Sequence, residues 1–125
     1  MSSRRRVLIV EDNPDGRLSL KLLLEAFGCE VQVACDGREG VEMALNWRPD
    51  AALVDVGLPQ LDGFEVARRV RAALHDRIRL VCVTAYSRAE DRKRSMEAGF
   101  DDYLIKPADP DRLRLLLAGA ADGDG

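Results

Sequence analysis

Acidic residues follow two of the most apolar runs in the chain. Glu11 and Asp12 come directly after the run Val-Leu-Ile-Val, and Asp55 ends the run Ala-Ala-Leu-Val-Asp. Taken alone, Asp55 reads as a residue that closes a strand and opens a turn. Because burial of an unpaired carboxylate is costly, each acid needs an exposed position or a positive partner. Thr84 and Lys106, which also follow apolar runs, complete the candidates for chemistry.

Three carboxylates brought together repel one another, and one lysine cannot neutralise them. A divalent cation that prefers oxygen ligands can do so, and Mg²⁺ typically takes one or two carboxylates and keeps several waters. A carboxylate beside Mg²⁺ can act as a nucleophile toward a phosphoryl group, whose oxygens are then bound by the metal, an ammonium and a hydroxyl. In this hypothesis Asp55 is the nucleophile, Lys106 the ammonium and Thr84 the hydroxyl.

These residues meet only if the ends of their strands meet. Short apolar runs predict five strands, at residues 6–10, 30–34, 51–55, 78–84 and 103–105. Helical patterns alternate with them, at residues 14–27, 38–47, 64–73, 88–98 and 111–118. The alternation predicts a doubly wound, flavodoxin-like α/β fold, with a five-stranded parallel sheet and helices on both faces. With strand order 2-1-3-4-5, strands one and three flank the switch point where such folds bind ligands.

Length and composition narrow the class of protein. The 125 residues suffice for one domain, and a net charge of -3 argues against sequence-independent nucleic-acid binding, which needs a basic surface. No apolar run reaches the roughly 18 residues of a membrane span. Three cysteines without metal-ligand spacing are typical of reduced thiols, so we expect a cytoplasmic location. The domain is predicted over residues 6–118, between an N-terminal arm at 1–5 and a flexible tail or linker at 119–125.

Short motifs stand in a fixed order along the chain: Val-Glu-Asp at 10–12, Asp-Val-Gly-Leu-Pro at 55–59, Asp-Gly at 62–63, Val-Thr-Ala at 83–85 and Lys-Pro at 106–107. Each is a weak signal alone, but together they are highly specific. From about residue 6 to 118, the chain resembles the receiver domain of two-component response regulators. The resemblance implies a phospho-accepting switch that catalyses only its own phosphorylation and dephosphorylation, and that is not an enzyme with a separate substrate.

The resemblance implies a role for each matching residue. Asp55 would accept a phosphoryl group from a histidine kinase or a histidine phosphotransfer protein. Mg²⁺, or Mn²⁺ in its place, would be bound beside Asp55 by Asp12 directly, by Glu11 through water and by the backbone carbonyl of Gly57. Lys106 would pair with the phosphoryl group.

The resemblance also implies a conformational change on phosphorylation. Thr84 would move toward the phosphoryl oxygen, and Tyr103 would be the switch aromatic that turns inward. The peptide bond between Lys106 and Pro107 is expected to be cis. The change would reach an output partner through the face made by the fourth helix, the fifth strand and the fifth helix, which is also where a homodimer would form.

Two positions bear on the lifetime of the phosphorylated state. Gly57 has no side chain that could position or block the water that hydrolyses an aspartyl phosphate. Tyr86, two residues beyond Thr84, is bulky enough to shield the phosphoryl group. Together they predict slow to moderate autodephosphorylation, which a Tyr86→Ala substitution should accelerate.

The first helix carries more leucine than its core face needs. Its core-facing stripe has helical spacing and comprises Leu20, Leu23, Leu24 and Phe27. Leu18 and Leu22 fall on the opposite side of this helix. They are either two ordinary exposed leucines or a partner patch beside the acidic site, where the resemblance places the docking of a kinase's helical bundle.

Two other functions are consistent with an aspartyl nucleophile near Mg²⁺. One is a phosphohydrolase, but such enzymes usually have a second acid two residues after the nucleophile, where this chain has Gly57. The other is a degenerate receiver that only binds proteins, against which the intact set of acids, hydroxyl and lysine argues. We expect either a free-standing receiver or a receiver from a longer protein, such as a hybrid kinase.

Overall fold

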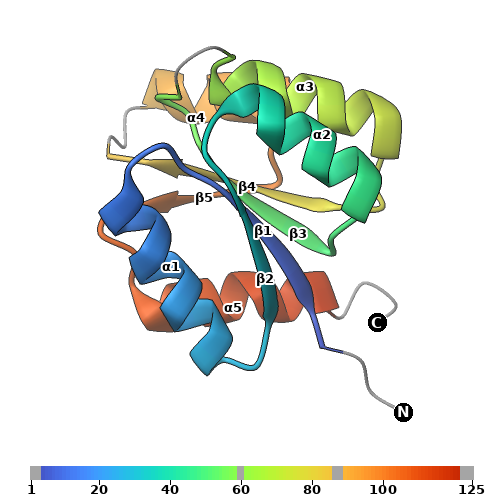
Figure 1. Ribbon diagram of the computed structural model, residues 1–125. Helices are drawn as coiled ribbons and strands as arrows, with labels where there is room; N and C mark the ends of the chain where they lie inside the picture. The colour runs from blue at the N-terminus through green and yellow to red at the C-terminus, as the bar shows by residue number, and fades with distance from the viewer. Residues whose placement is uncertain (1–3, 59–60, 86–88, 122–125) are drawn as a thin grey trace.

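Strands and helices alternate along the whole chain in the computed structural model, which describes residues 4–58, 61–85 and 89–121 (Figure 1). The strands are β1 (Arg6–Val10), β2 (Glu30–Ala34), β3 (Ala51–Asp55), β4 (Arg79–Thr84) and β5 (Asp102–Ile105). The helices are α1 (Pro14–Ala26), α2 (Gly37–Trp47), α3 (Gly63–Leu74), α4 (Ala89–Ala98) and α5 (Pro110–Ala121). Within the described residues, no helix combines the length and the apolar character needed to cross a membrane.

All five strands are parallel and lie in the order β2-β1-β3-β4-β5, which confirms the predicted topology. The register aligns the carboxyl ends of the inner strands, because Val10 is paired with Val54 and the next residue of β3, Asp55, is paired with Val83. At the far side Thr84 is paired with Ile105. The residues that follow these pairs therefore emerge along a single edge of the sheet.

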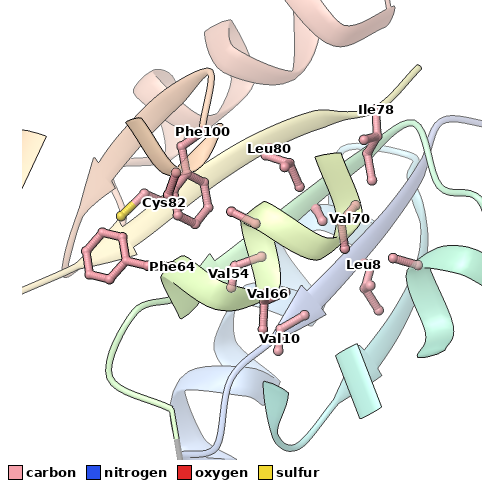
Figure 2. Packing of buried hydrophobic residues seen from close by; sticks show 14 of the residues in the cluster. Leu8, Val10, Val54, Phe64, Val66, Val70, Ile78, Leu80, Cys82 and Phe100 are labelled. Atoms are coloured by element: carbon pink, nitrogen blue, oxygen red, sulfur yellow. The ribbon is translucent and has the colours of Figure 1, made fainter. Parts of the chain in front are cut away.

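Helices cover both faces of the sheet, as the alternating pattern predicted (Figure 1). On one face, α1 and α5 pack on alternate strand residues such as Val7, Ile9 and Leu53. On the other face, α2, α3 and α4 pack on the residues between them, such as Leu8 and Val54. Figure 2 shows this second cluster, with side chains of α3 lying over the β1, β3 and β4 side chains.

The helices do not contribute equally to the core. Six of the twelve residues of α3 are buried: Gly63, Phe64, Val66, Ala67, Val70 and Leu74. In α4, by contrast, the buried residues are only Ser95 and Ala98. Six of the ten residues of α4 are charged, so the helix is held to the core by two small side chains.

A side chain fixes the connection that follows α4. Arg71 of α3 donates hydrogen bonds from Nη2 to the carbonyl oxygen of Gly99 (2.8 Å) and to Oδ2 of Asp101 (2.7 Å), and from Nη1 to the carbonyl oxygen of Ile78 (2.9 Å). The same Asp101 oxygen accepts the N–H of Leu80 at 2.8 Å. Arg71 therefore ties α3, the start of β4 and the α4–β5 loop together.

Local sequence signals account for the starts of three helices. Asn13, Asp36 and Asp62 each accept a backbone N–H of the first turn at 2.9 Å, as helix N-caps do. One predicted helix end is wrong: α5 continues to Ala121 instead of ending at residue 118, into the segment predicted as a tail. Alanine has the highest helix propensity, so Ala118, Ala120 and Ala121 favour this continuation, although Gly119 costs about 1 kcal/mol relative to alanine.

Candidate functional site

Three acidic residues converge at the carboxyl ends of β1 and β3. Glu11 and Asp12 directly follow β1, and Asp55 is the last residue of β3. One carboxylate oxygen from each of the three lies within 4.8 Å of the others. The convergence expected from the strand order is confirmed. Closely spaced carboxylate oxygens are the donor set that a hard divalent cation prefers, so these residues fit a Mg²⁺ site.

Lys106 reaches this acidic cluster from the loop after β5. Its Nζ lies 2.8 Å from Oε1 of Glu11 and 3.0 Å from Oδ2 of Asp55. The Lys106 N–H donates to the carbonyl oxygen of Thr84 at 2.8 Å, which anchors the loop to the end of β4. The peptide bond to Pro107 is cis, as expected. The contact with Asp55 matches the prediction, whereas the contact with Glu11 was not foreseen.

The environment shifts the pKa values of Glu11, Asp55 and Lys106 in different ways. Burial raises the pKa of the Glu11 carboxyl, and its hydrogen bond with Asp55 raises it further. Burial also opposes ionisation of Asp55, but hydrogen bonds from Glu11, the Gly57 N–H and Lys106 hold its pKa below the usual value. Partial burial would lower the pKa of Lys106, yet its bonds to both acids raise it. Of the two acids, Asp55 therefore ionises more readily than Glu11, and the ionised carboxylate is the form that a nucleophile needs.

Backbone groups orient the acids in ways that the sequence did not reveal. The Gly57 N–H donates to Oδ1 of Asp55 at 2.9 Å, and the Asn13 N–H donates to Oε2 of Glu11 at 3.2 Å. Arg17, one turn into α1, donates from Nη1 to the carbonyl oxygen of Glu11 at 2.9 Å. The only sequence signal for Arg17 is a basic residue one helical turn after an acidic pair. The predicted use of the Gly57 carbonyl stays a prediction.

Gly63 supports Asp55 from behind. A Cβ at this position would lie 2.4 Å from the carbonyl oxygen of Asp55 and 2.6 Å from the Cα of Val56. Only glycine therefore lets the first turn of α3 approach the end of β3 so closely. The motif Asp-Gly at 62–63 marked this position in the sequence. The steric requirement for glycine there follows only from the packing of α3 against β3.

Thr84 and Tyr103 line the same hollow on the side of the sheet that α4 covers. Thr84 ends β4 and is only 8% exposed, and Tyr103 of β5 is half-buried. This hollow is a cavity of about 70 Å³. The remaining lining residues come from the turn after β3 and from α3, β4 and α4: Val56, Phe64, Cys82, Asp91, Arg92 and Ser95. Tyr86, the predicted shield of the phosphoryl group, lies outside the described residues.

Leu18 and Leu22 lie on the solvent side of α1, with 54% and 57% of their surface exposed. Leu20 and Leu24, from the predicted core stripe, are buried. The orientation of α1 is therefore as predicted, while the use of the two exposed leucines stays a prediction. A groove of about 480 Å³ runs between α1 and the loop that carries Lys106.

Comparison with known sequences gives a consistent result. A family model described as the response regulator receiver domain matches residues 7–118. The response regulator MprA of Mycolicibacterium vanbaalenii is 38% identical over 124 residues, which are 96% of this chain and 53% of MprA. The transcriptional regulatory protein PrrA of Mycobacterium leprae is 42% identical over 105 residues, or 84% of this chain and 45% of PrrA. The chain thus spans about half the length of these two relatives.

Solved structures resemble this fold closely. The receiver domain of the sensor histidine kinase PA1611 from Pseudomonas aeruginosa has a TM-score of 0.85 and 34% identity, covering 95% of this chain and 99% of that one. Its structure has a magnesium ion coordinated in the active site cleft. A CheY-like receiver domain protein from Methanospirillum hungatei has a TM-score of 0.88 and 32% identity, with 98% of both chains covered.

Proposed function

Because the chain belongs to the family of response regulator receiver domains, we propose that it is a phospho-accepting switch of a two-component phosphorelay. Asp55 receives a phosphoryl group from a histidine kinase or a histidine phosphotransfer protein. The observation that carries this proposal is the position of the Asp55 carboxylate, whose side chain is 12% exposed and lies beside two other acids and 3.0 Å from the Lys106 ammonium. In this role the chain catalyses only its own phosphorylation and dephosphorylation.

The transfer itself is a substitution at phosphorus. An oxygen of Asp55 attacks the phosphorus of the donor's phosphohistidine, so that a P–O bond forms as the P–N bond breaks. The electron pair of the broken bond leaves with the imidazole nitrogen, which takes up a proton from solvent. Lys106 is already held by Glu11 at 2.8 Å, so its ammonium stays in place when a phosphoryl oxygen becomes its partner.

Glu11, Asp12, Asp55 and the carbonyl of Gly57 would hold Mg²⁺, with Mn²⁺ as a substitute. The metal would supply positive charge to the phosphoryl oxygens and offset the repulsion among the acids. Two observations support this assignment: the spacing of the three carboxylates within 4.8 Å and the magnesium ion in the cleft of the PA1611 receiver domain.

The output of the switch would leave through the face formed by α4, β5 and α5. Phosphorylation adds negative charge and hydrogen-bond acceptors next to Thr84, and a change there can shift the population of Tyr103 positions. A protein partner, or a second copy of the chain, would recognise the altered face. We place this domain at residues 6–118 and expect it to work in the cytoplasm.

Incubation with Mg²⁺ and acetyl phosphate, followed by intact mass measurement, tests the proposal. We expect the addition of one phosphoryl group to the unchanged chain and none to Asp55→Ala. Asp50→Ala is the matched control, because Asp50 is an acid that directly precedes the other end of β3. Rapid release of phosphate without an adduct would favour a phosphohydrolase, and no reaction would favour a module that only binds proteins.

A double substitution of Leu18 and Leu22 by serine tests the donor-docking patch. Burying a leucine side chain against a partner contributes about 1.5–3 kcal/mol when burial is complete. Because part of each side chain stays exposed in such a contact, we expect transfer from a phosphorylated phosphotransfer protein to slow by about tenfold or more. Labelling by acetyl phosphate should be unaffected.

Met96→Ser, which alters a 63% exposed side chain on α4, serves as the control for general surface effects. Equal slowing with the protein donor and with acetyl phosphate would reject the patch, because the small donor has no helix to dock.

A further inference from the structure

Tyr103 lines two hollows of the protein. One is the cavity of about 70 Å³ that Thr84 also lines. The other is a groove of about 250 Å³, lined by residues of β5, its following loop and α5, among them Ile105, Asp109 and Arg112. A half-buried tyrosine next to unfilled space can occupy more than one position, so the contacts of its ring decide which position is populated.

Arg92 of α4 contacts the Tyr103 ring. Its guanidinium carbon lies 4.5 Å from the centroid of the Tyr103 ring, within the range of a cation–π interaction. Arg92 also lines the cavity of about 70 Å³ together with Thr84 and Tyr103. The guanidinium thus covers the ring at the entrance to the space next to Thr84.

Arg94, two residues further along α4, provides a contrast. Its guanidinium carbon lies 4.2 Å from the centroid of the Phe64 ring. Phe64 is only 7% exposed and packs edge-to-face on Phe100 at 6.4 Å, and both rings belong to the core in Figure 2. The Arg94 contact therefore involves a ring fixed in the core, whereas the Arg92 contact involves the half-buried ring of a residue that lines two hollows.

From this arrangement we propose that Arg92 is a positioning residue for Tyr103. It holds the ring in place and so sets how often the ring enters the cavity beside Thr84. Because Arg92 belongs to α4, the same contact links the position of the ring to the position of the helix. This inference rests on the proposed function insofar as the Thr84 and Tyr103 positions respond to phosphorylation.

A cation–π contact at a partly exposed site changes an equilibrium by about two- to fivefold. We therefore expect Arg92→Gln to change the ratio of ring positions by this factor. If the ring position is coupled to phosphorylation, the fraction of the chain that is phosphorylated at a fixed acetyl phosphate concentration should change as well. Arg92→Lys keeps the charge without the planar group and should give an intermediate effect.

Fluorine NMR of the protein labelled with 3-fluorotyrosine measures the ring directly in the unphosphorylated chain. The chain has two tyrosines, and the signal that Tyr103→Phe removes identifies Tyr103. We expect Arg92→Gln to shift this signal and Arg94→Gln, which makes the same charge change on the same helix, to leave it in place. The mass measurement then gives the extent of phosphorylation of each variant.

An unshifted Tyr103 signal in Arg92→Gln, or an equal shift in Arg94→Gln, would overturn the proposal. So would a shifted signal with an unchanged extent of phosphorylation, because the contact would then be packing alone. If the unchanged chain takes up no phosphate, the proposed function fails, and the fluorine signal still decides whether Arg92 positions the Tyr103 ring.

Discussion

Lys106→Met is expected to slow phosphorylation of Asp55 by about 100-fold or more, because removal of one preorganised charge from a reaction site typically costs 10²–10³ in rate. The same substitution should strengthen Mg²⁺ binding, since it removes a cation that lies 2.8 Å from Glu11 and 3.0 Å from Asp55. Opposite effects on rate and metal affinity distinguish a direct role of Lys106 from general damage to the site. Calorimetric titration with Mg²⁺ and the acetyl phosphate reaction measure the two quantities.

Lys106→Met should also lower the free energy of unfolding when Mg²⁺ is left out. Unpaired buried carboxylates are costly, but the Lys106 side chain is 36% exposed and solvent screens its ion pairs, so we expect a loss of about 1–2 kcal/mol. The folded-state pKa of Lys106 is raised above 10.5, so its stabilising effect is present at neutral pH and is lost only as pH rises through that raised value.

Lys93→Met is the matched control, because it removes an exposed lysine from α4. It should change neither the rate nor the stability measured by urea unfolding. If Lys106→Met bound Mg²⁺ more weakly than the unchanged chain, the electrostatic account of the site would be wrong.

Gly63→Ala is expected to affect folding more than Lys106→Met does. The added Cβ would lie 2.4 Å from a backbone oxygen of Asp55 and 2.6 Å from a backbone carbon of Val56, neither of which can rotate away. Overpacking typically lowers the free energy of unfolding by about 1–3 kcal/mol. Because the added Cβ collides with backbone atoms, we expect a loss of about 3 kcal/mol for Gly63→Ala. Because α3 must shift away from β3, the surviving folded protein should also take up phosphate more slowly.

Gly57→Ala provides a matched comparison on the other side of the same carboxylate. Its Cβ would lie 3.7 Å from Oδ1 of Asp55, an ordinary contact, so the stability should change by about 0.5 kcal/mol or less. Urea unfolding measures both variants. A Gly63→Ala protein as stable as Gly57→Ala would show that the approach of α3 to β3 is looser than the structure indicates.

The sequence predicted the sheet and the position of the acids because both depend on local patterns. Apolar runs define the strands, polar residues mark their ends, and the alternation with helices leaves few topologies. From these rules Glu11, Asp12 and Asp55 had to meet at one edge. Their approach within 4.8 Å confirms this prediction.

The contacts that the sequence did not predict depend on how far side chains reach between elements. The pairing of Lys106 with Glu11, the bonds of Arg17 to the backbone after β1 and the clamp formed by Arg71 each join segments whose distance follows only from packing. The close approach at Gly63 is of the same kind. Such contacts involve residue types that are equally common on exposed surfaces, so no periodicity distinguishes them.

The small buried area of α4 has an energetic consequence for signalling. Moving a two-state equilibrium from 1:99 to 99:1 takes about 5.5 kcal/mol, which in the proposed switch a single phosphoryl group would supply through its differential contacts with the two states. A helix held by Ser95 and Ala98 would give up little apolar contact if it shifted. The Arg71 side chain meanwhile holds the loop at Gly99. We therefore expect any displacement of α4 to pivot near its carboxyl end, and its amides to exchange with solvent well before those of α3.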